Sequence, residues 1–139
     1  MKIANEFTVS APIEDAWDVL TDLEAWPQRI ETVDTVELLT PAPLSEGSRV
    51  RLKQPKLPEG TWDITVWDPP SYFEWTQKMT ATSVAGHRVE ALGEGRTQLT
   101  LTLEMRGLVI SIIGRFYRDL TNRYMHLEAE GMKRAAESA

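Results

Sequence analysis

The feature that most constrains the fold is a change of hydrophobic period near residue 107. Residues 96–105, RTQLTLTLEM, alternate cleanly, with Leu99, Leu101, Leu103 and Met105 on one face and Thr100, Thr102 and Glu104 on the other. From residue 109 to residue 137 the apolar residues instead recur at helical spacing, which predicts a helix of roughly 40 Å. The preceding part of the chain must therefore cover the apolar face of a long C-terminal helix.

Most segments before residue 96 also alternate with period two and are separated by turn residues, which predicts further strands. These segments are residues 3–9, 33–39, 49–54, 61–68, 72–79 and a stretch near 83–91. In the segment 61–68, the alternation places Trp62, Ile64 and Val66 on one face. The pattern predicts an α+β fold, in which a strongly curved antiparallel sheet of about seven strands wraps around the helix.

Residues 9–30, VSAPIEDAWDVLTDLEAWPQRI, break this run of strands. Pro12 suits a first helical position, and Ile13, Ala16, Trp17 and Leu20 then follow helical spacing. A second short helix is expected to end or bend at Trp26 and Pro27. The sequence thus predicts two short helices directly after the first strand.

Length and charge narrow the possible functions. The 139 residues fit one domain, 1–139, and the absence of cysteine excludes disulfides and thiolate chemistry. A net charge of −6 argues against nucleic acid as a partner. We find no signal peptide, transmembrane segment, metal-ligand spacing or cofactor motif, and expect a cytoplasmic protein without cofactors that is a monomer or homodimer.

Three stretches in this order resemble the START-like (SRPBCC) superfamily, and its bacterial polyketide cyclase/dehydrase-like branch in particular. The stretches are VSAPIEDAWDVLTDLEAWPQRI, VAGHRVEALGEGRTQLTLTLEMRG and GRFYRDLTNRYMHLEAEGMKRAAE, and the resemblance covers essentially the whole chain. The resemblance implies a helix-grip fold with a cavity between the sheet and the long helix. It leaves the function open, because this fold hosts lipid carriers, hormone receptors, ring cyclases and chaperone cofactors.

In the fold that the resemblance implies, the two short helices form a V that supports one end of the long helix. Trp17 is then expected to be a core anchor. Trp26, at the bend, is the better candidate for lining or gating the mouth of the cavity.

Polar residues on apolar strand faces are the first candidates for ligand contacts. His87 shares a face with Ala85 and Val89, and is either a general acid/base or a core histidine satisfied by a neighbour. It is the best catalytic candidate, although no aligned carboxylate partner is visible in the sequence. The predicted ligand-binding residues are Asn5, Trp26, Trp75, Gln77, His87, Val89, Leu101, Leu103, Phe116 and Leu120.

Three functions fit these observations. The first is binding or carriage of a hydrophobic small molecule: a lipid, an isoprenoid quinone or an aromatic polyketide. The second is a polyketide aromatase/cyclase that uses the same cavity, although no inward Arg–Tyr pair for ketone oxygens is evident. The third is an interaction module whose pocket is vestigial.

Overall fold

A single antiparallel sheet of seven strands forms the framework of the molecule, as the alternating segments predict. The computed structural model describes residues 1–139. The strands lie in the order β1-β7-β6-β5-β4-β3-β2, so every strand after β1 pairs with its neighbour in sequence. Their bounds are β1 Lys2–Val9, β2 Thr35–Leu38, β3 Arg49–Lys53, β4 Gly60–Asp68, β5 Tyr72–Lys78, β6 Thr82–Gly93 and β7 Arg96–Arg106.

Strand β4 departs from simple alternation. Its register against β5 shifts between Ile64 and Val66, as a β-bulge does when it inserts one residue. Ile64 is buried, but Val66 is exposed, and Trp67 packs against the core in its place. The expectation that Val66 shares the inner face of Trp62 and Ile64 is therefore wrong, because the bulge reverses the facing of every later residue.

Two short helices and an intervening 3₁₀ turn follow β1. They are α1 Ile13–Thr21, η1 Leu23–Ala25 and α2 Trp26–Arg29, with Pro12 as the N-cap of α1 rather than its first residue. The ring of Trp17 lies 5.5 Å from that of Trp67 and 6.3 Å from that of Phe73. Trp17 is thus a core anchor, as expected.

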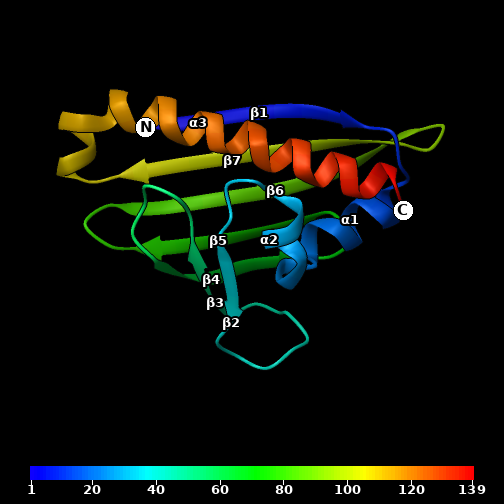
Figure 1. Ribbon diagram of the computed structural model, residues 1–139, viewed down its shortest axis with the longest axis horizontal. Helices are drawn as coiled ribbons and strands as arrows, with labels where there is room; N and C mark the ends of the chain where they lie inside the picture. Colours follow the sequence, from blue (N-terminus) through cyan, green and yellow to red (C-terminus); the bar gives the residue numbers. More distant parts are fainter.

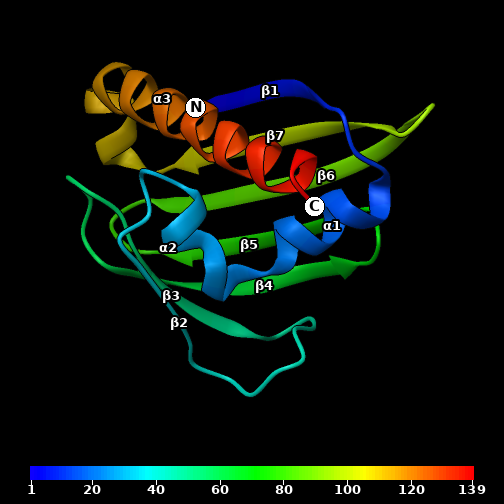
Figure 2. The ribbon, with the colours of Figure 1, turned by 45° about the vertical axis from the view of Figure 1, so that its right-hand side comes forward.

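The long helix α3 runs from Leu108 to Glu137 and lies over the sheet beside α1 and α2 (Figure 1 and Figure 2). Its second half buries an apolar stripe that includes Met125, Ala129 and Met132, whereas Ile110 is the one buried residue of its first three turns. The apolar stripe expected from residue 109 onward is therefore buried in the second half of the helix but largely exposed in the first half. No helix in the protein is long and apolar enough to span a membrane.

A glycine on α3 sets the spacing between α3 and α2. A Cβ atom at Gly131 would overlap the backbone oxygen of Arg29, whereas one at Gly114 would lie 3.5 Å from the nearest atom, Ile110 Cγ2. The backbone of α2 thus passes directly against α3, which holds Trp26 at the end of the space between helix and sheet.

We expect Gly131→Ala to lower the free energy of unfolding by roughly 2 kcal/mol, because overpacking against rigid backbone exceeds the gain in helix propensity. Gly114→Ala is the matched control and should raise it by about 0.5–1 kcal/mol. Urea denaturation of both variants measures the difference. Equal stabilisation by the two alanines would show that α2 does not pack against α3 as described.

Candidate functional site

A cavity of about 240 Å³ lies between the sheet, the loop before β4 and helix α3. Sixteen of its 26 lining residues are hydrophobic, so a molecule inside it would meet mainly apolar surface. Exposed lining residues, among them Met79, Thr80 and Val109, gather at the β5–β6 turn and the start of α3. This end is the mouth, and the opposite, inner end is closed by Trp26, Trp75 and His87.

His87 is held at the inner end by aromatic rings. Its imidazole is 3% exposed, stacks on Phe73 at a centroid distance of 4.1 Å and meets the edge of Trp75 at 5.3 Å. Its Nδ1 lies 3.4 Å from the carbonyl oxygen of Phe73. A neutral ring that donates through Nδ1 presents Nε2 as an acceptor.

Glu128, on α3, faces His87 from the other side of the cavity. Its Oε1 lies 3.6 Å from His87 Nε2, which is longer than a hydrogen bond. The same oxygen is shielded from solvent and has no hydrogen-bond partner. A buried carboxylate oxygen without a donor is costly. Because Glu128 lines the cavity, a hydroxyl or amine of a bound molecule that reached its carboxylate would be stabilised.

Glu128 is a site residue that sequence analysis missed, because it is not among the predicted ligand-binding or catalytic residues. The signal was present in the spacing. Thr121, Tyr124, Met125 and Glu128 follow one another at helical intervals and all line the cavity. The sequence shows no carboxylate partner for His87, but in the structure Glu128 of α3, which is distant in sequence, lies beside it.

Gln77 also lines the cavity, near the mouth side of β5. Its amide group occupies the position that a Cβ atom would take at Gly60. A larger residue at position 60 would therefore require the Gln77 side chain to move away. The pair Gly60–Gln77 therefore places a neutral polar group in an otherwise apolar wall.

The cavity includes six of the ten predicted ligand-binding residues and leaves out four. Those that line it are Trp26, Trp75, Gln77, His87, Leu101 and Leu103. Those outside it are Asn5, Val89, Phe116 and Leu120. The predicted role of each remains a prediction, and the positions of the last four do not favour it.

Each of the four outlying residues has a physical explanation. Asn5 donates from Nδ2 to Asn122 Oδ1 at 2.8 Å, so α3 satisfies its amide without a ligand. Val89 lies in the core beyond the inner end. Phe116 is 73% exposed, and Leu120 is half-buried; both lie in the first half of α3, most of whose residues are exposed to solvent.

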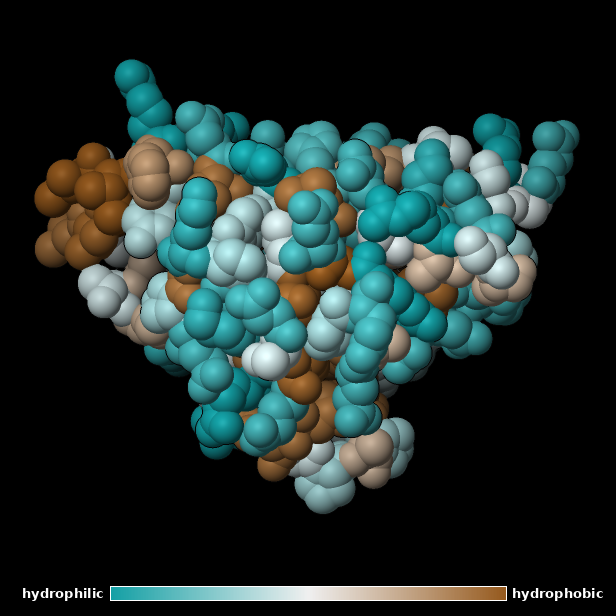
Figure 3. Space-filling model, viewed as in Figure 1, coloured by the Kyte–Doolittle hydropathy of each residue, from teal (hydrophilic) through white to brown (hydrophobic).

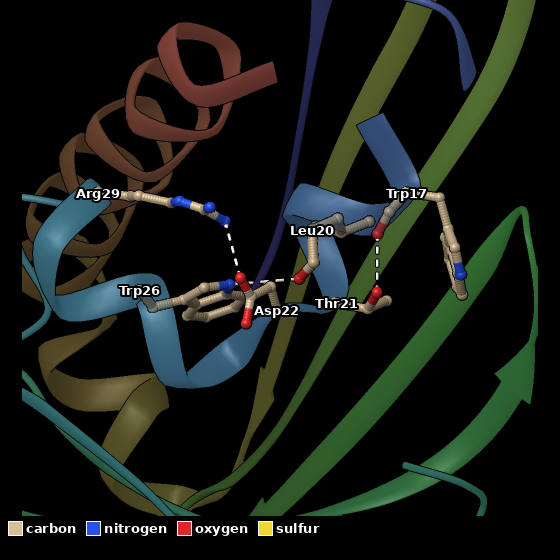
Figure 4. A network of polar contacts seen from close by, with 6 residues as sticks. All are labelled: Trp17, Leu20, Thr21, Asp22, Trp26 and Arg29. Carbon is tan, nitrogen blue, oxygen red and sulfur yellow. Dashed lines mark hydrogen bonds and ion pairs between the residues drawn. The ribbon is translucent and has the colours of Figure 1, made fainter. Parts of the chain in front are cut away.

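Trp26 lines the cavity at the inner end and not at the mouth, which corrects its expected place. It is 2% exposed, and its ring lies 5.4 Å from Trp75 and 6.1 Å from His87. Its Nε1 donates to the carbonyl oxygen of Leu20 at 3.2 Å, and Arg29 pairs with Asp22 beside it at 3.3 Å (Figure 4). These contacts fix the indole as a wall rather than a gate.

Tyr72 on β5 has an altered acidity. Burial, followed by the hydrogen bond to Glu74 and the charge of that carboxylate, raises the pKa of Tyr72 from 10.0 to about 12, although Arg88 over its ring opposes this. A raised pKa means that the neutral phenol stabilises the fold below pH 10, and that this contribution is lost as the pH rises toward 12.

We expect an absorbance titration of tyrosinate to show one phenol that ionises near pH 12, because the pKa of Tyr72 is raised. Tyr72→Phe should remove this late component, and Tyr117→Phe should leave it in place. If Tyr117→Phe removed the late component instead, the raised pKa would belong to Tyr117, and the prediction for Tyr72 would be wrong.

A curved seven-stranded sheet, a long C-terminal helix and an apolar cavity between them define a START-like, helix-grip protein. The chain belongs to the family described as "Polyketide cyclase / dehydrase and lipid transport", whose sequence model matches residues 1–137. The family resemblance and the α+β helix-grip fold predicted from sequence are both confirmed.

Similar proteins include two from Streptomyces and one from Mycobacterium smegmatis. A Streptomyces halstedii protein named "Putative polyketide cyclase" is 29% identical over 86 residues, which are 62% of this chain and 72% of that protein. The ZhuI aromatase/cyclase from Streptomyces sp. R1128 is 21% identical, with a TM-score of 0.81 over 99% of this chain and 93% of that one. A START superfamily protein from Mycobacterium smegmatis is 18% identical, with a TM-score of 0.74 over 96% and 97%. At these identities the two structures show the fold alone.

Proposed function

We propose that the protein binds a hydrophobic small molecule in this cavity, with the apolar part against the aromatic wall and a hydroxyl or amine toward Glu128. The observation that carries this proposal is the apolar cavity with the Glu128 carboxylate in its lining. The family description, which names both cyclases and lipid transport, is consistent with a ligand of this class.

Cavity volume limits the ligand. Pockets for drug-sized molecules measure about 300–1,000 Å³, and this cavity measures about 240 Å³. It therefore suits a fused ring pair, or one end of a longer lipid, isoprenoid quinone or aromatic polyketide whose remainder leaves through the mouth. The last arrangement matches a cavity closed at the inner end and open at the β5–β6 turn.

Native mass spectrometry of freshly purified protein tests this function, with solvent extraction to identify what is released. We expect a fraction of the protein to carry an apolar compound with at least one hydroxyl or amine. A purely apo sample that also fails to bind 2-naphthol, a fused-ring alcohol, would overturn the proposal in favour of a vestigial pocket.

The pair of His87 and Glu128 favours a second candidate function, polyketide cyclisation. In that reaction His87 Nε2 would take a proton from the carbon between two ketones, and the resulting carbanion would attack a second ketone carbon. The new alkoxide would then take the proton back, and loss of water would follow as His87 removes a second proton and protonates the leaving hydroxyl. Glu128, 3.6 Å from Nε2, would stabilise the imidazolium between these steps.

If the protein cyclises a poly-β-ketone thioester, we expect His87→Ala to lower the rate of cyclised product formation by about 10²–10⁴-fold, the usual contribution of general acid–base catalysis. Glu128→Gln should lower the rate less, because the imidazolium loses its counter-charge. His126→Ala, which removes the exposed histidine beside Phe7, is the matched control. Equal rates for His87→Ala and His126→Ala would exclude the catalytic role.

A further inference from the structure

The start of α3 and the adjoining β5–β6 turn carry an exposed hydrophobic surface that the fold does not use. We call it the apolar tip, and its residues are Met79, Leu108, Val109, Ile112, Ile113 and Phe116. Figure 3 shows it as a brown cluster at the left end of the molecule, where Figure 1 places the start of α3. Leu108, Ile112 and Phe116 are 85%, 82% and 73% exposed.

The shape of the apolar tip favours a fluid partner. Side chains with so much of their surface in solvent protrude, and a rigid protein partner would need a matching pocket for each. A lipid bilayer accepts protruding apolar side chains without such pockets, as it does with interfacial helices. A clustered patch of this kind is unusual on a protein surface that has no partner.

Charge around the apolar tip identifies the kind of bilayer. Residues 75–89 and 105–118 contain no aspartate or glutamate, although the whole chain has 21 such residues and a net charge of −6. The exposed basic residues of these two segments include Lys78, Arg106 and Arg115, and Lys78 and Arg106 lie at the same end of the strands, each paired in register with Thr82. Glu104, just before the second segment, pairs with Arg106 at 3.2 Å, whereas Lys78 and Arg115 form no ion pair. This end is therefore basic on an acidic protein, which suits an anionic surface.

The apolar tip is also continuous with the mouth of the cavity. Met79 and Val109 belong to both. A Cβ atom at Gly107 would lie 3.3 Å from the carbonyl oxygen of Thr80, so the β5–β6 turn packs against the start of α3. Whatever covers the apolar tip therefore also covers the mouth.

We propose that the apolar tip docks on an anionic lipid bilayer, with Leu108, Ile112 and Phe116 entering the interface and Lys78 and Arg115 contacting lipid phosphates. Docking brings the mouth of the cavity against the membrane, so an apolar ligand passes between them without crossing water. This last step rests on the proposed function, whereas docking itself does not.

Vesicle flotation tests the docking, with vesicles of phosphatidylcholine alone or mixed with phosphatidylglycerol. We expect the protein to float with the anionic vesicles, to float less as salt is raised, and to remain behind with the neutral ones. The double variant Ile112→Asp/Phe116→Asp should bind the anionic vesicles more weakly. Each substitution is expected to lower the affinity ~10-fold or more, since each side chain loses its burial in lipid. Leu92→Asp, on an exposed leucine of the β6–β7 hairpin, is the matched control and should bind like the unaltered protein.

Two outcomes would overturn the proposal. One is no flotation with either vesicle. The other is a homodimer in analytical ultracentrifugation that Ile112→Asp dissociates, which would make the apolar tip an interface between two copies. Binding of 2-naphthol by the double variant separates the two proposals, because an intact cavity in a protein that no longer floats shows that docking alone was lost.

Discussion

Replacing Trp26 by alanine is expected to lower the free energy of unfolding by about 3–5 kcal/mol, the usual cost of removing a fully buried tryptophan. The indole is 2% exposed and contacts both Trp75 and His87. Its removal also leaves the carbonyl oxygen of Leu20 without its donor. The helix α2 would then lose the side chain that fixes it over the inner end of the cavity.

Trp62→Ala is the control for this prediction. Trp62 also lines the cavity, and its ring lies 5.5 Å from Trp75, but it is only half-buried. Urea denaturation should therefore show a smaller loss for Trp62→Ala than for Trp26→Ala. Equal losses, or a loss below 1 kcal/mol for Trp26→Ala, would contradict the place given to Trp26 as the inner wall.

The second large effect is expected from filling the cavity. Ala85 lies on the inner face of β6, paired in register with Trp75 and Leu103, and lines the cavity. Ala85→Trp places an indole in the space of about 240 Å³, so we expect the affinity for 2-naphthol to fall ~10-fold or more, because the ligand and the new ring compete for one volume. Equilibrium dialysis measures this affinity.

Ala91→Trp controls for the change of residue, because Ala91 lies on the same strand but is exposed. It should bind 2-naphthol as the unaltered protein does. Circular dichroism must show that Ala85→Trp is folded. If the folded Ala85→Trp variant kept full affinity, the probe would bind elsewhere and the cavity would not be the ligand site.

The fold was largely predictable from sequence because its signals are local. The strict alternation of β7 and the helical spacing of α3 each lie within one segment, and their order leaves few architectures. The bulge between Ile64 and Val66 was not predictable, since it changes pairing without changing the apolar pattern. The exposed first half of α3 was not predictable either, because helical spacing shows which face of a helix is apolar but not how much of the helix the sheet covers.

For the candidate site, the sequence predicted the residues that the strands contribute to the cavity, but not Glu128, which the helix α3 contributes. Parity along β5 and β6 placed Trp75, Gln77 and His87 on one face, and the structure brings all three to the cavity. The pairing of His87 with Glu128 depends on the rotation of α3 over the sheet, which no local pattern fixes. The hydrogen bond of Asn5 could not be foreseen, because its partner, Asn122, is 117 residues away in sequence.

Nuclear magnetic resonance of the tryptophan indole N–H groups tests the central claim most directly, since the five tryptophans divide into two sets. Trp26, Trp62 and Trp75 line the cavity, whereas Trp17 and Trp67 pack in the core beside Phe73. During titration with 2-naphthol we expect the indole resonances of the first three to shift and saturate together, while those of Trp17 and Trp67 stay in place. Unchanged resonances of the first three, or shifts confined to Trp17 and Trp67, would contradict ligand binding in this cavity.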